Sequence, residues 1–155
     1  MTVKGRLAAL ALAGLGALGA CHKNTSSGAG GSPSASGAPE AQHVDGTPHP
    51  DAAVKAWQGA GLPAEGFAPL APVPYGAAYC EEGRVDTIDT VVCEYHDAES
   101  LARGKNALLD QWGREGGHTG LATQTKLTLL GVFDRARRDP NGKTISKVID
   151  TFRKL

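Results

Sequence analysis

Residues 76–95 read GAAYCEEGRVDTIDTVVCEY, and this stretch decides the fold because it predicts a β-hairpin closed by two cysteines. If Asp86-Thr87 forms a two-residue turn, Cys80 and Cys93 lie directly opposite each other. Counting pairs outward from the turn makes the cysteines a non-hydrogen-bonded pair, with Cα atoms about 4.5 Å apart. That separation is within the range of a disulfide.

Two turns are compatible with this hairpin. The two-residue turn pairs Glu82 with Val91 and Arg84 with Asp89, and the second of these pairs is of opposite charge. Asp-Thr is not a favoured sequence for such a turn, however. A longer loop that uses Gly83 is the alternative.

Cys80 and Cys93 are expected to form a disulfide. They remain as an even pair once Cys21 is assigned to the N-terminal segment described below, and disulfides are typical of exported proteins. Two buried thiols are the alternative. A metal-binding pair is disfavoured, because the two cysteines are widely spaced and no histidines cluster with them.

Two amphipathic helices and two further strands are predicted after the hairpin. Asp97 is a suitable N-cap for the first helix, and Gly116-Gly117 ends it. Residues 119–125 and 127–134 are rich in Thr, Leu, Val and Phe, as strands are. After a turn at 139–142, the last helix has one apolar face, formed by Ile145, Val148, Ile149, Phe152 and Leu155.

Before the hairpin, Asp51 is expected to cap a short helix that carries Trp57. Residues 67–75 contain three prolines and are expected to form an extended covering strand or strap, with a proline-recognition ligand as the alternative. The predicted fold of residues 51–155 is therefore α+β. It is a two-layer sandwich in which two amphipathic helices pack on one face of an antiparallel sheet of about four strands, with a short N-terminal helix added.

Residues 22–50 are predicted to be a disordered tether. Gly, Ser, Ala and Pro dominate the segment, and Val44 is its one large aliphatic residue. Such a composition buries too little apolar surface to offset the entropy lost on ordering. A flexible coil of this length has a root-mean-square span of about 30 Å.

The first 21 residues carry a recognisable processing pattern. Lys4 and Arg6 precede an apolar run from Leu7 to Leu18, and the run leads into the box Leu18-Gly19-Ala20-Cys21. This pattern resembles the bacterial lipoprotein signal. The resemblance implies removal of residues 1–20, lipidation of the Cys21 sulfur and acylation of its new amino group, so that residues 21–50 tether the domain to an envelope membrane.

His22 occupies the position where aspartate signals retention in the inner membrane of well-known Gram-negative bacteria. The resemblance therefore favours the outer membrane, at its periplasmic face or at the cell surface.

The charge of the processed chain argues against nucleic-acid binding. It has 14 basic and 16 acidic residues, a net charge of −2, whereas nucleic-acid-binding domains are usually strongly basic. Acids concentrate in residues 81–99 and bases in residues 135–155. We expect these segments either to attract each other or to be solvated separately. The functional alternative is that Arg135, Arg137 and Arg138 bind an anionic partner such as a wall polymer.

No catalytic motif or cofactor fingerprint is recognisable in the sequence. Glu94, His96, Asp97 and His118 could ligate a metal ion, but a surface histidine beside a helix cap is the favoured interpretation. The chain is therefore expected to be a non-enzymatic binding or scaffolding module of the envelope, without a cofactor or bound metal. The alternatives are an inhibitor or ligand-binding module that acts on an envelope enzyme through Glu81 and Glu82, and a metal-dependent enzyme that uses His96.

Overall fold

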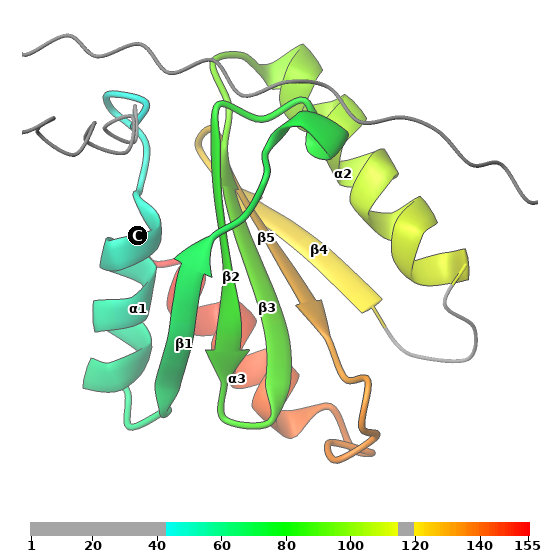
Figure 1. The fold of residues 1–155 in the computed structure, drawn as a ribbon. Helices are drawn as coiled ribbons and strands as arrows, with labels where there is room; N and C mark the ends of the chain where they lie inside the picture. Colours follow the sequence, from blue (N-terminus) through cyan, green and yellow to red (C-terminus); the bar gives the residue numbers. More distant parts are fainter. Residues whose placement is uncertain (1–42, 115–119) are drawn as a thin grey trace, which may run out of the picture. The chain divides into compact units, whose positions relative to one another are not determined.

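The predicted hairpin lies at the centre of a five-stranded antiparallel sheet (Figure 1). The computed structural model describes residues 43–114 and 120–155, which belong to one compact unit. In chain order its elements are α1 (Pro50–Gly59), β1 (Ala64–Pro69), the 3-10 helix η1 (Val73–Tyr75), β2 (Tyr79–Val85), β3 (Ile88–Glu94), α2 (Ala98–Arg114), β4 (Gly120–Thr125), β5 (Thr128–Phe133) and α3 (Lys143–Phe152).

The register of the central hairpin is the one that the sequence predicts. In the β2–β3 pair, Cys80 faces Cys93 and Val85 faces Ile88. Asp86 begins the two-residue turn with φ at +56°, a conformation that aspartate adopts more readily than most residues with a side chain. The shorter turn therefore closes the hairpin, and the longer loop through Gly83 does not form.

The disulfide between Cys80 and Cys93 is present. The sulfur atoms are 2.01 Å apart and the Cα atoms 4.1 Å apart, and both residues are buried. The bond therefore joins β2 to β3 inside the hydrophobic core.

The sheet has one strand more than the four or so expected. Its strand order is β1-β2-β3-β5-β4, with every neighbouring pair antiparallel. The extra strand, β1, ends in the proline-rich stretch, whose later part forms η1. The register of β1 shifts between Glu65 and Ala68, where Gly66 adopts a φ of +69° that glycine accepts without steric cost.

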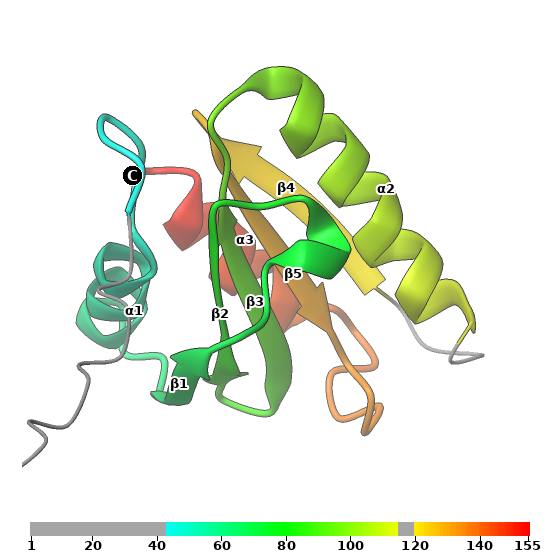
Figure 2. The same ribbon diagram turned by 45° about the horizontal axis from the view of Figure 1, so that its top comes forward.

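The helices cover both faces of the sheet, whereas the sequence predicted two amphipathic helices on one face. Buried side chains of α1 and α3 share one core cluster with the sheet, and those of α2 belong to another. In Figure 2, α3 lies behind the strands and α2 lies on the other side, over β4 and β5. The fold is therefore α+β with an antiparallel sheet, as predicted, but the sheet is the middle layer of three.

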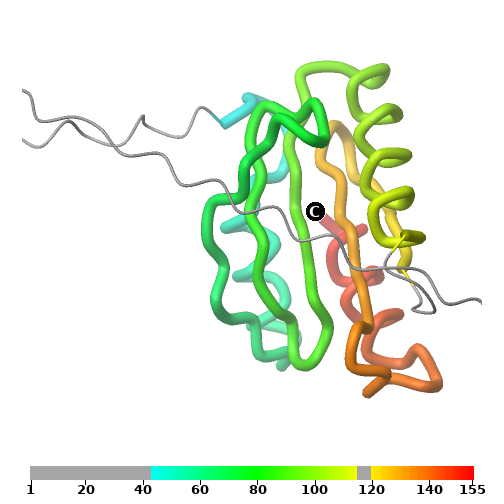
Figure 3. The backbone as a smooth tube through the Cα atoms, turned by 45° about the vertical axis from the view of Figure 1, so that its right-hand side comes forward, coloured from blue at the N-terminus to red at the C-terminus, as the bar shows by residue number. Residues whose placement is uncertain are grey.

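The alternation of side chains along β3 explains the two core clusters. Ile88 and Val92 point toward α1 and α3, and Val91 and Cys93 point toward α2. Alternate residues of a strand lie on opposite faces, so a run of six buried residues from Thr90 to Tyr95 requires cover on both sides. Figure 3 shows the backbones of β2, β3 and β5 running side by side.

Of the two helix caps expected from the sequence, Asp97 is confirmed and Asp51 is not. Asp97 caps α2, because its Oδ1 accepts a hydrogen bond from the Ser100 N–H at 2.7 Å. At α1 the N-cap residue is His49, with Pro50 in the first turn, so Asp51 lies inside the helix that it was expected to cap.

Residues 43–49, which composition assigns to the tether, lie against the folded domain. Val44 and Thr47 are buried. The Thr128 hydroxyl donates to the carbonyl oxygen of Pro48 at 2.6 Å and lies 2.6 Å from the Thr47 hydroxyl. This part of the predicted tether is therefore fixed by buried hydrogen bonds.

Within the described residues, none of the helices combines the length and apolar character that a membrane span requires.

Candidate binding groove beside helix α2

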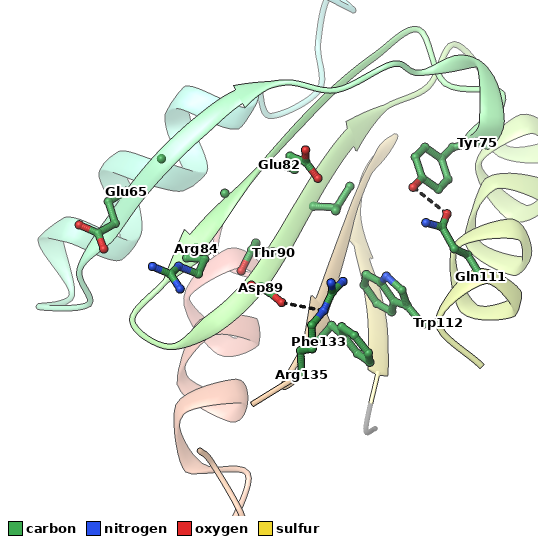
Figure 4. A pocket seen from close by; sticks show the side chains of 13 residues that line it. Glu65, Tyr75, Glu82, Arg84, Asp89, Thr90, Gln111, Trp112, Phe133 and Arg135 are labelled. Atoms are coloured by element: carbon green, nitrogen blue, oxygen red, sulfur yellow. Dashed lines mark hydrogen bonds and ion pairs between the residues drawn. The ribbon is translucent and has the colours of Figure 1, made fainter. Parts of the chain in front are cut away.

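Helix α2 covers only part of its face of the sheet. It contacts η1, β4 and β5, and beside it, over β1 to β3, the described residues form an open groove of about 610 Å³ (Figure 4). We refer to this feature as the α2 groove.

The floor of the α2 groove comes from the predicted hairpin. Glu82 and Arg84 lie on the same face of β2 as the buried Cys80, and their cross-strand partners Val91 and Asp89 extend that face onto β3. Cys80 is buried whereas Glu82 and Arg84 are exposed. The face therefore changes from core to open surface along a single strand.

The wall of the groove is formed by η1 and the last turns of α2. The Tyr75 hydroxyl donates a hydrogen bond of 2.9 Å to Gln111 Oε1, which ties η1 to α2. The rings of Trp112 and Phe133 stack with their centroids 5.2 Å apart. The Trp112 ring also packs against Gly131, where a Cβ would lie only 2.5 Å from it.

The charged side chains of the groove are of mixed sign. Glu65, Glu82 and Asp89 line it together with two arginines, Arg84 and Arg135. Arg135 Nε lies 3.4 Å from Asp89 Oδ2, and the guanidinium lies 5.4 Å from the centre of the Phe133 ring. Acidic groups therefore outnumber basic ones by one, and the basic residue nearest the wall is already paired.

The three arginines proposed as a partner-binding group do not line one site. Arg135 reaches the α2 groove, whereas Arg137 lines a separate pocket beside Asp139 and Ile145. The backbone N–H of Arg138 donates to Asp134 Oδ1 at 2.9 Å. The expected attraction between the acidic and basic segments is represented by the ion pair of Arg135 with Asp89.

The residues first considered as metal ligands are also separated. Asp97 is engaged as a helix cap, and hydrogen bonds from the backbone and side chain of Ser100 lower the pKa of its carboxyl. His96 is exposed, and His118 lies outside the described residues. Glu94 is fully buried and faces two other histidines.

Apart from the α2 groove, a polar cluster lies where residues 43–49 meet the end of β3. His43 Nδ1 and His49 Nδ1 lie 2.8 Å and 3.1 Å from Glu94 Oε1. We refer to it as the His43–His49–Glu94 cluster. Sequence reasoning missed it because both histidines stand in the stretch whose composition indicates a tether. Glu94 itself carried a signal in the sequence, since it is a charged residue within the otherwise apolar stretch from Val91 to Tyr95.

Comparisons of this chain with protein-family models, with curated proteins and with solved structures found no match.

Proposed function

We propose that this chain is a lipid-anchored protein of the bacterial envelope whose folded domain is a non-enzymatic binding module. Its ligand site is the α2 groove, and the ligand is a segment of a partner protein. The observation that carries the proposal is the groove itself, an open sheet face with charged side chains of both signs beside a wall of aromatic residues.

The membrane anchor is supported by the resemblance of residues 1–21 to a lipoprotein signal. A test is metabolic labelling with an alkyne-bearing palmitate, in the parent chain and in Cys21→Ser. Label that is incorporated by the parent and lost from the variant supports the anchor. Equal labelling of both proteins, or labelling of neither, contradicts it.

The chemistry of the groove favours a protein partner over an anionic wall polymer. Arg135 and Asp89 form an ion pair, which leaves two carboxylates, Glu65 and Glu82, against one arginine, Arg84. This excess of negative charge disfavours a polyanion. Basic side chains of a bound polypeptide segment could pair with Glu65 and Glu82. An acidic side chain of the same segment could pair with Arg84. Alternating charges of this kind select partners by electrostatic complementarity.

The nature of the lining favours binding over catalysis. The described residues that line the groove include no serine, cysteine or histidine, so a serine or cysteine nucleophile paired with an imidazole base cannot form from them.

Site-specific photocross-linking tests the groove. A benzophenone amino acid is introduced into the full chain at Glu82, which lies in the groove, and in a second protein at Lys147. Lys147 is an exposed residue of α3, on the opposite face of the sheet. We expect one dominant protein adduct from position 82 in intact cells, and no such adduct from position 147.

A charge reversal in the groove provides a second test within the same cross-linking experiment. Arg84→Glu should reduce the yield from position 82 at least tenfold, because it reverses the main basic contact that the groove offers. Identical adducts from positions 82 and 147 would contradict the proposal, as would a yield insensitive to Arg84→Glu. If the captured partner is an envelope enzyme, an activity assay decides whether the module inhibits it.

A further inference from the structure

We propose that the His43–His49–Glu94 cluster is a binding site for a divalent transition-metal ion of the zinc class. Residues 43–49 supply both imidazoles, and the end of β3 supplies the carboxylate. The site is separate from the α2 groove and does not depend on the function proposed for it.

The carboxylate is held in one orientation inside the protein. The side chain of Glu94 has no exposed surface, and its Oε2 accepts a 2.7 Å hydrogen bond from the Val44 N–H. Its Oε1 is directed at both imidazoles. One carboxylate oxygen is thus used to hold the group in place. The other, Oε1, is hydrogen-bonded to the two imidazoles, and a metal ion would replace the protons of those hydrogen bonds.

The two histidines are held in position by the segment that carries them. Between them, Thr47 and Pro48 are joined to Thr128 by buried contacts of 2.6 Å. His49 is also the N-cap residue of α1. The two imidazole rings have their centroids 4.5 Å apart, so a metal ion would not have to bring together distant parts of the chain.

The spacing of the three groups fits a small cation. Each residue offers one ligand atom, and these atoms lie within 4.8 Å of one another. Zinc bonds of about 2.0–2.2 Å in tetrahedral geometry place ligand atoms about 3.3 Å apart. The two Nδ1–Oε1 separations of 2.8 Å and 3.1 Å need adjustments of only a few tenths of an ångström. The remaining separation, between the ligand nitrogens of the two histidines, is at most 4.8 Å and would have to shorten toward about 3.3 Å if it is at that limit.

The identity of the ligands determines the class of metal. Imidazole nitrogens with a single carboxylate suit zinc, copper and nickel, whereas calcium and magnesium prefer oxygen ligands alone. The histidine side chains are 38% and 40% exposed. An ion held by three protein ligands would therefore keep at least one coordination position open to water.

Calorimetric titration of the full chain with zinc tests the site. Every protein carries Cys21→Ser, so that no thiol competes for the metal. We expect one equivalent of zinc to bind tightly, and His43→Ala or His49→Ala to weaken that binding at least tenfold. His96→Ala is the matched control, because it removes an exposed histidine outside the cluster and should leave the affinity unchanged.

Thermal unfolding provides a readout that does not depend on heat of binding. Zinc at a hundredfold excess over its dissociation constant should raise the Tm of the parent by about 10 °C, and should raise that of His43→Ala much less. Both histidines are partly exposed, so these variants should fold. Binding weaker than 100 μM in the parent, or equal affinity in all variants, would overturn the proposal. The cluster would then be a hydrogen-bonded latch alone.

Discussion

At the scale of single residues, Tyr95 stands out because its buried hydroxyl has no hydrogen-bond partner among the described residues. The oxygen lies close to α2, where a Cβ at Gly104 would be only 2.1 Å away. A buried hydroxyl without a partner loses its hydration without compensation. We therefore predict that Tyr95→Phe raises the free energy of unfolding by about 1 kcal/mol, measured by urea denaturation.

Tyr75→Phe is the matched control for that prediction. The hydroxyl of Tyr75 donates to Gln111, so removing it should lower the free energy of unfolding by about 1 kcal/mol. If both variants shift stability in the same direction, the explanation given for Tyr95 is wrong.

The burial of Tyr95 also leads to a prediction for the free energy of unfolding at alkaline pH. Burial, with a smaller contribution from Tyr75, raises the pKa of Tyr95 from its usual 10.0 to about 12. The folded state thus retains the phenol proton that the unfolded chain loses near pH 10. Stability should be full below pH 10 and fall by up to about 2 kcal/mol between pH 10 and 12.

Urea denaturation at pH 8, 10 and 11.5 measures this effect. Tyr95→Phe should reduce the loss without abolishing it, because burial and the neighbouring Glu81 also raise the pKa of Tyr79. A loss that is the same in Tyr95→Phe as in the parent would show that Tyr95 is not the titrating group.

At the scale of elements, the β2–β3 hairpin should depend on its disulfide. Cys80 and Cys93 are 13 residues apart, and closing a loop of this size contributes about 3 kcal/mol in the chain-entropy description. We predict that Cys80→Ala with Cys93→Ala lowers the free energy of unfolding by about 3 kcal/mol. Chemical reduction of the parent should give a similar loss, and no change after reduction would contradict the prediction.

The hairpin and the last helix were predictable because local sequence determines them. The positions of Cys80 and Cys93 define the register, and the period of apolar residues in α3 defines its buried face. Which face of the sheet each helix covers is not a local property. The largely apolar stretch from Val91 to Tyr95 was a signal in the sequence for cover on both faces, but it does not say which helix covers which face.

The candidate sites were less predictable, because they too depend on contacts between distant parts of the chain. The floor of the α2 groove follows from the hairpin register, but its wall depends on where α2 packs. The His43–His49–Glu94 cluster joins residues about 50 positions apart. Composition could not reveal it, because a few buried contacts are enough to hold residues 43–49 in place.

At the scale of the whole molecule, residues 43–49 contribute to the stability of the domain. Val44 is 9% exposed, whereas Val73 in η1 is 84% exposed. We predict that Val44→Ala lowers the free energy of unfolding by about 2 kcal/mol, through lost burial and the cavity left behind. Val73→Ala should change it by less than about 0.5 kcal/mol. Equal, small effects would mean that residues 43–49 detach from the domain in solution.

The route by which the chain enters the domain has a mechanical consequence. Residues 43–49 are held by Glu94 at one end of β3, and the Asp89–Arg135 pair of the groove lies near the other end of that strand. Five residues of extended chain separate the two points, about 17 Å along the strand. Under the anchor and the groove function proposed above, a force applied between residue 43 and a segment bound in the groove would run along β3. Such a load shears the hydrogen bonds to β2 and β5 together rather than opening them one at a time, and the core disulfide lies within the loaded hairpin.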